Sequence, residues 1–454
     1  MAATLDADWI GRALERTLAR DDGAWAELFL EARAVHRIST GRTREETALD
    51  SGGAIRVLGG SAASRQVSVS GAWPDCVDLL TRRLFDGGHQ TRETGEPDRI
   101  LTEVAAGAAE EGRRLSGYLA ELEGHLERCI PPGASVSLEA EASIQRIRHQ
   151  STRSQQVTDT RTGILIRVTP VHRGRPLPSF VLASGSVAEL HRRRPAEECA
   201  RRFAEAASLE FEGLAWGPAP EYETSVVLCP GTAGLLFHET VGHLLQGDMS
   251  APLREAGGDL SPLLTVVEHS PGVSGRGGYR VDDEGVEPRT VSLVEGGRVT
   301  GFVGARRRDG SPAGSTGSGR RQSFRDPASA RLAATIVSAG QDDPEEIVSS
   351  TKKGILVQEV RSGSVDPVSG EFVLHAAHGR MIEHGRPAGA TGEFLILGTV
   401  PNSLRTIDRI AHDIGDDGGA SSCVHHGQAV PVIVGLPTLR MVTIKVRSLE
   451  MVRA

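Results

Sequence analysis

The stretch from residue 225 to residue 245 constrains the fold of this chain more than any other. Its pattern predicts a strand at residues 225–228, a turn at 229–232 and an apolar helix at 233–245. Inside that helix, residues 238–243 are His-Glu-Thr-Val-Gly-His. Two imidazoles and a carboxylate are costly to bury in an apolar helix unless a partner satisfies them. A metal ion is the favoured partner, because imidazoles are metal ligands and a neighbouring carboxylate can act as a general base.

The spacing of the two histidines predicts a distorted helix. His238 and His243 are five residues apart, so a regular α-helix would direct their side chains about 140° away from each other. A one-residue π-bulge would bring both onto one face, and Gly242 lowers the cost of leaving α geometry there. The competing interpretation is an ordinary core or surface helix, because a chain with 15 histidines contains close pairs by chance.

A catalytic zinc ion needs a third protein ligand beside two histidines and keeps one position open. Cys423 is a candidate on local grounds, because it lies between a polar run at 416–422 and an apolar strand predicted at 429–434. A cysteine at such a junction can approach a helix from outside, although a lone cysteine is more often a small buried apolar residue. The histidines of the second half and its many carboxylates stay open as alternatives; the histidines are His269, His375, His378, His384, His412, His425 and His426.

Length and charge exclude several classes of protein. A chain of 454 residues is too long for one ordinary core and indicates two or three domains. The net charge of −8, from 51 basic and 59 acidic side chains, does not favour nucleic acid or an anionic membrane as a partner. The N-terminus lacks a signal pattern, and no apolar run is long enough to cross a membrane. The five cysteines form no CxxC pair, which fits a reducing compartment, so we expect a soluble cytoplasmic protein.

The pattern of elements predicts an α+β protein with two domains. Residues 1–215 are expected to form an N-terminal mixed α/β domain, followed by a linker at 216–220. Residues 216–454 are expected to form a C-terminal, mainly antiparallel β domain that carries the metal-binding helix. In the first domain the predicted helices are 8–19, 77–85, 99–109, 112–128 and 187–207, and the predicted strands are 24–32, 53–58, 138–149 and 164–169, with turns at 50–53 and 159–163. In the second domain we predict a hairpin of 291–295 with 299–303, a helix at 345–350, and strands at 354–360, 371–375, 380–383 and 438–446.

A loop rich in glycine, serine and arginine is predicted at residues 310–321. Arg320 and Arg321 end this loop. Either guanidinium is a candidate to stabilise negative charge on a substrate oxygen or to bind a substrate carboxylate. A pair of solvated loop arginines is an equally good interpretation.

Five sequence blocks follow one another through the second half. They are 238–248 with the histidine motif, 279–285 (Tyr-Arg-Val-Asp-Asp-Glu-Gly), 317–323 (Gly-Ser-Gly-Arg-Arg-Gln-Ser), 365–372 (Val-Asp-Pro-Val-Ser-Gly-Glu-Phe) and the run from Ser422 and Cys423 to Leu439. In this combination and order they resemble the TldD/PmbA (TldD/TldE) zinc metallopeptidase family, on its TldD-like, metal-bearing side. The resemblance covers nearly all of residues 223–446, whereas the first half matches only loosely, around 53–57.

The resemblance implies one zinc ion held by His238, His243 and Cys423, with Glu239 as the base that activates a water molecule. It also implies peptide substrates bound with little regard to their sequence. A heterodimer with a metal-free TldE/PmbA-like homologue is the implied assembly, and a homodimer is the lesser alternative. Gln246 stands where the family commonly has glutamate, a departure that concerns substrate selection rather than metal chemistry.

Two other functions remain open. The chain could be a TldD-like hydrolase recruited to process an amide bond of a small molecule or natural product. It could also be a non-catalytic scaffold subunit, although such a subunit has no need to keep two histidines, a glutamate and a cysteine. Zinc content and peptide cleavage distinguish these alternatives.

Overall fold

The fold is mixed α+β, and strands predominate. The computed structural model describes residues 25–39, 44–58, 65–70, 76, 99–130, 132–152, 154–172, 174–176, 179–201, 203–204, 221–247, 253, 259–268, 274–306 and 314–449. The helices predicted at 8–19 and 77–85, the linker at 216–220 and His269 lie outside these described residues.

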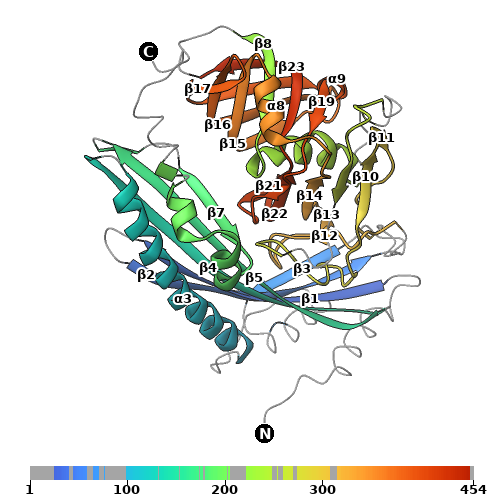
Figure 1. Cartoon of the computed structure of the whole chain (residues 1–454). Helices are drawn as coiled ribbons and strands as arrows, with labels where there is room; N and C mark the ends of the chain where they lie inside the picture. The colour runs from blue at the N-terminus through green and yellow to red at the C-terminus, as the bar shows by residue number, and fades with distance from the viewer. Residues whose placement is uncertain are drawn as a thin grey trace.

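The N-terminal part is an antiparallel sheet with a long helix on one face (Figure 1). Its strands run in the order β3-β2-β1-β4-β5-β6, and β7 also pairs with β5. The helix, α3 (Arg99–Cys129), buries residues at helical spacing, among them Leu115, Leu122 and Leu126, against the sheet. The strands are β1 (Trp25–Ser39), β2 (Arg44–Leu58), β3 (Arg65–Ser70), β4 (Ala134–Ser151), β5 (Ser154–His172), β6 (Arg175–Pro176) and β7 (Phe180–Ser184).

Two predicted turns in this sheet are wrong, because their glycines lie inside strands. Gly52 belongs to β2, and a Cβ atom there would lie 2.3 Å from the ring of Phe324. Gly163 belongs to β5, where a Cβ atom would lie 2.8 Å from Cγ of Arg276. Both glycines therefore allow residues of the second half of the chain to approach the sheet closely, a requirement that local sequence cannot reveal.

Two helix boundaries also differ from prediction. The segments predicted as helices at 99–109 and 112–128 form the single helix α3. The glycine at 112 does not end the helix, because each interior glycine costs only about 1 kcal/mol and the helix buries an apolar face. The predicted helix at 187–207 is interrupted after α4 (Val187–Arg193). Pro195 explains that interruption, since proline lacks an N–H and disfavours helical geometry in the residue before it.

The C-terminal part contains a sheet that closes on itself. The order is β15-β8-β23-β18-β16-β17, an additional pairing joins β15 to β16, and β19 pairs with β23. The pairing of β15 with β8 is parallel, and the others in this sheet are antiparallel. These strands are β8 (Tyr222–Leu228), β15 (Lys353–Val365), β16 (Glu371–Glu383), β17 (Arg386–Ala390), β18 (Phe394–Thr399), β19 (Ile407–Ile410) and β23 (Leu439–Ser448). The two strands predicted at 371–375 and 380–383 are thus one, and the helix predicted at 345–350 is confirmed as α8 (Pro344–Ser350).

A second C-terminal sheet lies between the closed sheet and the N-terminal sheet (Figure 1). Its order is β11-β10-β9-β14-β22-β20, with β21 paired to β22. The predicted hairpin across Gly296 and Gly297 is confirmed, and the pairing of β14 with β22 is parallel. The strands are β9 (Val266–Glu268), β10 (Val291–Glu295), β11 (Arg298–Val299), β14 (Ala334–Val337), β20 (Gly415–Asp416), β21 (Ser421–His425) and β22 (Gln428–Leu436), and a separate ladder joins β12 (Gly319–Arg320) to β13 (Ser329–Ala330).

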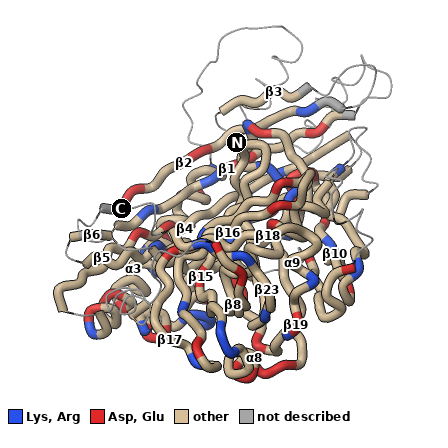
Figure 2. Tube along the Cα trace, turned by 90° about the horizontal axis from the view of Figure 1, so that it is seen from above, with Lys and Arg blue, Asp and Glu red and all other residues tan. Residues whose placement is uncertain are grey.

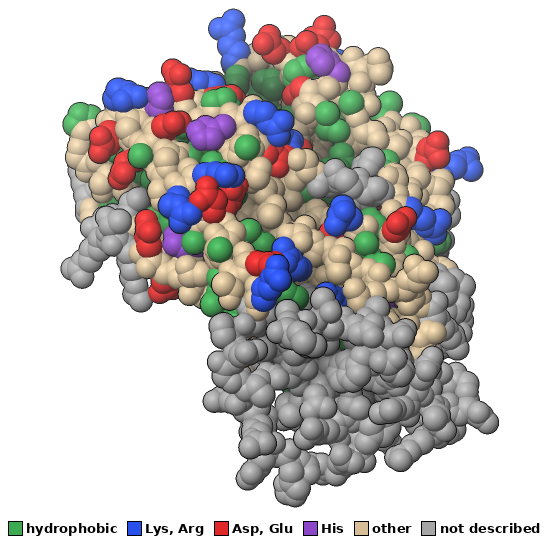
Figure 3. Space-filling model, turned by 90° about the horizontal axis from the view of Figure 1, so that it is seen from below, with side chains coloured by type: hydrophobic (Ala, Val, Ile, Leu, Met, Phe, Trp, Pro, Cys, Tyr) green, Lys and Arg blue, Asp and Glu red, His purple; other side chains and the backbone are tan. Residues whose placement is uncertain are grey.

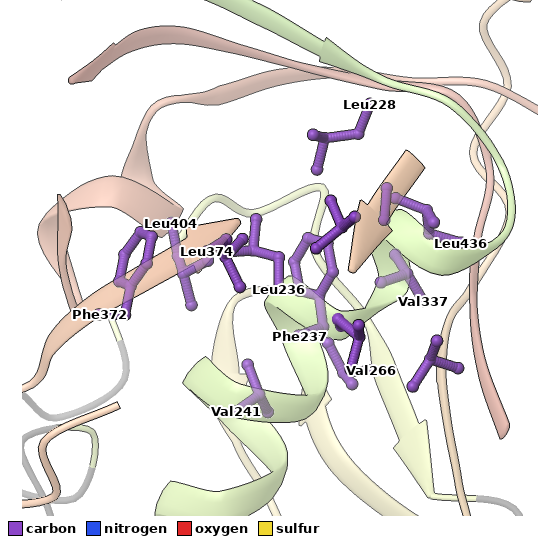
Figure 4. Close-up of a cluster of buried hydrophobic side chains, with 14 of the residues drawn as sticks. Leu228, Leu236, Phe237, Val241, Val266, Val337, Phe372, Leu374, Leu404 and Leu436 are labelled. Atoms are coloured by element: carbon purple, nitrogen blue, oxygen red, sulfur yellow. The ribbon is translucent and has the colours of Figure 1, made fainter. Parts of the chain in front are cut away.

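One hydrophobic core joins the two C-terminal sheets around the segment that carries the histidines. Phe237 and Val241 of this segment are fully buried in that core. Figure 4 shows them beside Val266 and Leu374, which come from the second sheet and from the closed sheet respectively. Burying an apolar side chain of this size stabilises a fold by about 1.5–3 kcal/mol, so the segment is held firmly on its apolar side.

The N-terminal sheet contacts the C-terminal part through an aromatic cluster and buried ion pairs. Phe324 packs against Phe29 and Ile147 of the sheet. Arg56 of β2 pairs with Glu27 of β1 at 2.7 Å and with Glu284 of the C-terminal part at 2.8 Å. Because charges so deeply buried tolerate little change in geometry, these pairs fix the orientation of one part on the other.

The surface of the described residues mixes both signs of charge. Figure 2 shows Lys and Arg interspersed with Asp and Glu along the trace, and Figure 3 shows the same mixture on one face. Within the described residues, no helix is both long enough and apolar enough to cross a membrane.

Candidate metal centre

The backbone of the histidine segment changes geometry at the motif. After β8 the chain forms short helical turns at Thr232–Gly234 and Leu235–Phe237, then a π-helix at His238–Gly242 and a final turn at His243–Leu245. The N–H of His243 donates to the carbonyl of His238, which is the five-residue hydrogen bond of a π-helix. The predicted π-bulge is therefore confirmed. Gly242 is also needed for packing, because a Cβ atom there would lie 2.5 Å from Cδ1 of Leu332.

The π-helix and the β21–β22 hairpin bring three metal-ligating side chains together. The ligand atoms of His238, His243 and Cys423 all lie within 4.8 Å of one another, and Nε2 of His243 is 3.5 Å from Sγ of Cys423. All three residues are buried, at 0%, 7% and 3% exposure respectively. Of the third-ligand candidates among the described residues, Cys423 alone completes such a cluster. Two imidazoles and one sulfur are a donor set that suits zinc.

A chain of hydrogen bonds orients the first histidine. Nδ1 of His238 lies 3.3 Å from the hydroxyl of Thr335, and that hydroxyl donates to Glu268 at 3.0 Å. Since the hydroxyl proton of Thr335 goes to Glu268, its oxygen accepts from Nδ1–H, and Nε2 of His238 keeps its lone pair. That Nε2 atom is buried and has no hydrogen-bond partner among the described residues. An unsatisfied buried nitrogen beside a second imidazole and a thiol fits a metal ion.

The third metal-ligating residue, Cys423, is held by a tight hairpin and a buried arginine. Cys423 lies opposite Val430, and the hairpin turns through His426 and Gly427, both with positive φ. Arg331 is fully buried and donates to the backbone carbonyl of Cys423 at 2.5 Å and to that of Gln428 at 3.1 Å. The arginine therefore fixes both strands of the hairpin beside the histidines.

The electrostatics of the three donors favour their ligand forms. Burial lowers the pKa of His238 and of His243, so both imidazoles are neutral at neutral pH. Burial alone would raise the pKa of Cys423, but the neighbouring imidazole of His238 and the charge of Arg331 hold it below its usual value. The thiolate, which is the metal-binding form, is thereby favoured.

The glutamate of the motif faces the open side of the site. An oxygen of Glu239 lies 4.0 Å from Nε2 of His243, and its side chain is 13% exposed. Burial raises the pKa of Glu239, which makes its carboxylate a better proton acceptor than an exposed one. Gly363 of β15 leaves the space that this side chain occupies, because a Cβ atom there would lie 2.8 Å from Cγ of Glu239.

A cleft of about 1010 Å³ opens over Glu239 and His243. One wall comes from the N-terminal sheet and includes Arg167 and Val181. The opposite side is formed by residues 361–365 of β15 and by the β21 hairpin. The volume is at the upper end of the range for small-molecule sites and suits a ligand of several residues. The candidate metal site therefore lies at the base of a cleft between the two parts of the chain.

The two arginines proposed from sequence do not reach this cleft. Arg320 is buried in β12 and donates to the carbonyls of Leu332 at 2.8 Å and Pro431 at 2.9 Å. Arg321 is also buried and pairs with Glu27 of the N-terminal sheet at 3.4 Å. Both guanidiniums thus hold parts of the protein together, and neither lines the cleft. The interpretation as solvated loop residues is wrong for both.

The sequence alone did not reveal the residues that hold the metal ligands in place through hydrogen bonds. Thr335 is 97 positions from His238, and Glu268 is 67 positions from Thr335. Arg331 is 92 positions from Cys423. No spacing rule links residues so far apart, and only the fold brings them to the site.

The fold and the site define a mixed α+β protein with a buried two-histidine, one-cysteine cluster at the base of a cleft. The family model described as PmbA/TldA metallopeptidase C-terminal domain matches residues 221–448, which is half of the chain. The chain belongs to the PmbA/TldD metallopeptidase family.

The similar proteins agree with this placement. A Haemophilus influenzae protein named Metalloprotease TldD homolog is 32% identical over 233 residues, which cover 49% of this chain and 48% of that protein. A Saccharolobus solfataricus protein named Zinc metalloprotease TldD homolog is 27% identical over 236 residues, covering 49% and 51% respectively. The chain therefore spans about half the length of the curated relatives it matches.

The crystal structure of TldE from Thermococcus kodakarensis has the same fold. Its TM-score is 0.68, and the match covers 96% of this chain and 99% of that chain. The sequence identity is 17%, so the likeness concerns the fold alone. It extends through the N-terminal half, where the sequence resemblance is weak.

Proposed function

We propose that this chain is the zinc-bearing subunit of a TldD-type peptidase that hydrolyses amide bonds of unfolded or modified peptides. The observation that carries this proposal is the cluster of His238, His243 and Cys423 beside Glu239, at the base of a cleft. The names of the similar metalloproteases support it, and so does membership of the family.

Each residue of the cluster has a distinct task in this proposal. His238, His243 and Cys423 would hold the zinc ion through Nε2, Nε2 and Sγ. A bound zinc ion would polarise the amide carbonyl and lower the pKa of the attacking water. Glu239 takes the proton of that water and delivers it to the leaving amine. The burial of Glu239, which raises its pKa, suits a residue that must both accept and release a proton.

The strands around the cleft suit a substrate in extended conformation. Beyond residue 357, β15 pairs only with β16 among the described strands, and residues 361–365 border the cleft. Strand β21 likewise pairs only with β22 among them. A peptide can add to such a strand edge through main-chain hydrogen bonds, which any sequence supplies. Because a folded protein presents few free strands, this mode of binding selects unfolded peptides.

The proposed assembly is a heterodimer with a metal-free TldE/PmbA-like homologue. The chain shares its fold with a TldE structure over 96% of its length, and this supports a partner of the same architecture. Co-expression with a neighbouring homologue, followed by mass measurement of the purified complex, tests this assembly. A stable homodimer in the presence of that homologue would contradict it.

The test of the function combines metal content with cleavage. The purified chain, alone and with its homologue, is assayed for zinc by mass spectrometry and for cleavage of a mixture of unstructured peptides. The expected result is about one zinc ion per chain and broad cleavage that Glu239→Gln abolishes, with a folded protein left intact. Zinc without peptide cleavage would favour a dedicated small-molecule or natural-product amide, and absence of zinc would favour a scaffold subunit.

A further inference from the structure

Amide hydrolysis creates a negative charge that the site has to stabilise. When water adds to the carbonyl carbon, an electron pair of the C=O bond moves onto the oxygen. Hydrogen-bond donors aimed at that oxygen stabilise the charge. Removing one such donor lowers kcat on the order of 10²–10³-fold. Arg320 and Arg321 cannot supply the donor, because their guanidiniums are buried against other groups of the protein.

The hairpin that carries the cysteine places another donor beside the cluster. Side chains two residues apart on a strand point to the same face, so His425 lies on the face of Cys423. The centroid of the His425 ring is 5.9 Å from that of His243, and both residues line the cleft. His425 does not belong to the group of three metal-ligating atoms. Its imidazole is therefore close to the cluster and accessible to a substrate.

The position of this imidazole is fixed by the turn that follows it. His425 pairs with Gln428 across a two-residue turn, whose residues His426 and Gly427 have φ values of 50° and 75°. The side chain of Gln428 donates to the carbonyl of Pro327 at 3.0 Å. The His426 ring packs on the His425 ring, with centroids 3.9 Å apart. A donor held on such a hairpin needs little reorganisation when charge develops in front of it.

We propose that His425 is a catalytic residue, which donates its imidazole N–H to the substrate carbonyl oxygen as that oxygen becomes an oxyanion. The role rests on the proposed amide hydrolysis. In the first step the water oxygen bonds to the carbonyl carbon, and Glu239 takes the proton. In the second step the C=O bond re-forms, the C–N bond breaks, and the nitrogen receives the proton from Glu239. His425 keeps its own proton throughout and stabilises the charge between the two steps.

The variant His425→Phe removes the donor and keeps a ring of similar size. We expect kcat to fall about 10²–10³-fold, while KM for the peptide and the zinc content stay close to those of the wild type. Affinity for a phosphinic peptide, which mimics the tetrahedral intermediate, should fall by the same factor as kcat/KM. His425→Gln, which retains an N–H donor, should recover part of the lost rate.

His384 offers a matched control. It lies at the turn between β16 and β17, is exposed, and is followed by Gly385, with φ values of 51° and 76° like those of the other His-Gly turn. His384→Phe should leave kcat and the affinity for the phosphinic peptide unchanged.

Three results would overturn the proposal. A kcat of His425→Phe near that of the wild type would show that the donor is unnecessary. Loss of zinc from this variant would make His425 a metal ligand instead. Failure of the wild-type complex to cleave any peptide would overturn the proposed function and this role together, whereas the first two results leave the hydrolase function standing.

Discussion

The hydroxyl of Thr335 gives the sharpest prediction about the metal centre. Thr335→Val replaces this hydroxyl by a methyl group of similar volume at a fully buried position. It removes the acceptor for Nδ1–H of His238, at 3.3 Å, and the donor to Glu268, at 3.0 Å. No hydrogen bond from Thr335 then sets the tautomer and the orientation of the buried His238 imidazole.

The expected loss of zinc affinity follows from the place of the Thr335 hydroxyl, which bonds to the ligand His238 and not to the metal. Removing an outer partner of a metal-ligating histidine weakens metal affinity about 10–100-fold, which corresponds to roughly 1.4–2.8 kcal/mol. The metal-free protein should also lose about 1–3 kcal/mol of stability, because Glu268 keeps its bonds from Ala333 and Ala334 but loses one donor inside the core.

Zinc affinity is measured by competition with a chromogenic chelator, and stability by urea unfolding of the metal-free chain. Thr240→Val is the matched control, since Thr240 is equally buried in the same segment but donates to the carbonyl of Leu236 at 2.6 Å. That variant should lose some stability and no zinc affinity. Equal zinc affinity for Thr335→Val and the wild type would refute the proposed orienting role.

Three further variants test the proposed base, the third zinc ligand and the buried ion pairs between the two parts of the chain. Glu239→Gln should retain zinc and fold normally. Its hydrolysis of unstructured peptides should fall about 10²–10⁴-fold, because a general base is lost. An active variant would show that Glu239 is not that base. Cys423→Ala should weaken zinc binding by more than about 100-fold in equilibrium dialysis, because losing a ligand costs more than losing a residue that only hydrogen-bonds to a ligand. Full zinc occupancy in this variant would mean that another residue is the third ligand. Arg56→Met should destabilise the protein by about 3–5 kcal/mol in urea unfolding, because Glu27 and Glu284 both lose the buried cation that lies between them. A change below about 1 kcal/mol would show that the two ion pairs of Arg56 do not fix the two parts of the chain.

The parts of the site that sequence predicts are those encoded locally. The five-residue spacing of His238 and His243 required a distortion, and the π-helix at this point has that geometry. The place of Cys423 between a polar run and a strand makes it a candidate, and the family resemblance selects it among the alternatives; the hairpin does bring it to the histidines. The physics of the π-helix is contained within a few neighbouring residues, whereas the approach of Cys423 to His243, 180 positions away, depends on the fold.

The remaining features depend on contacts between distant segments. Gly52 and Gly163 looked like turn residues, but they lie in strands and make room for Phe324 and Arg276. Arg320 belongs to a loop in the sequence and to a buried strand in the fold. In each case the residue type is required by a contact with a distant segment of the chain. No local pattern distinguishes such a residue from one in a turn or a solvated loop.

X-ray absorption at the zinc edge of the purified chain reports directly on the atoms that hold the metal. We expect one sulfur at about 2.3 Å and two imidazole nitrogens at about 2.0–2.1 Å from the zinc ion, with a light atom in the fourth position. The sulfur shell should disappear in Cys423→Ala. A zinc ion without a sulfur neighbour, or a sulfur shell that survives this substitution, would contradict the assignment of His238, His243 and Cys423 as the metal centre.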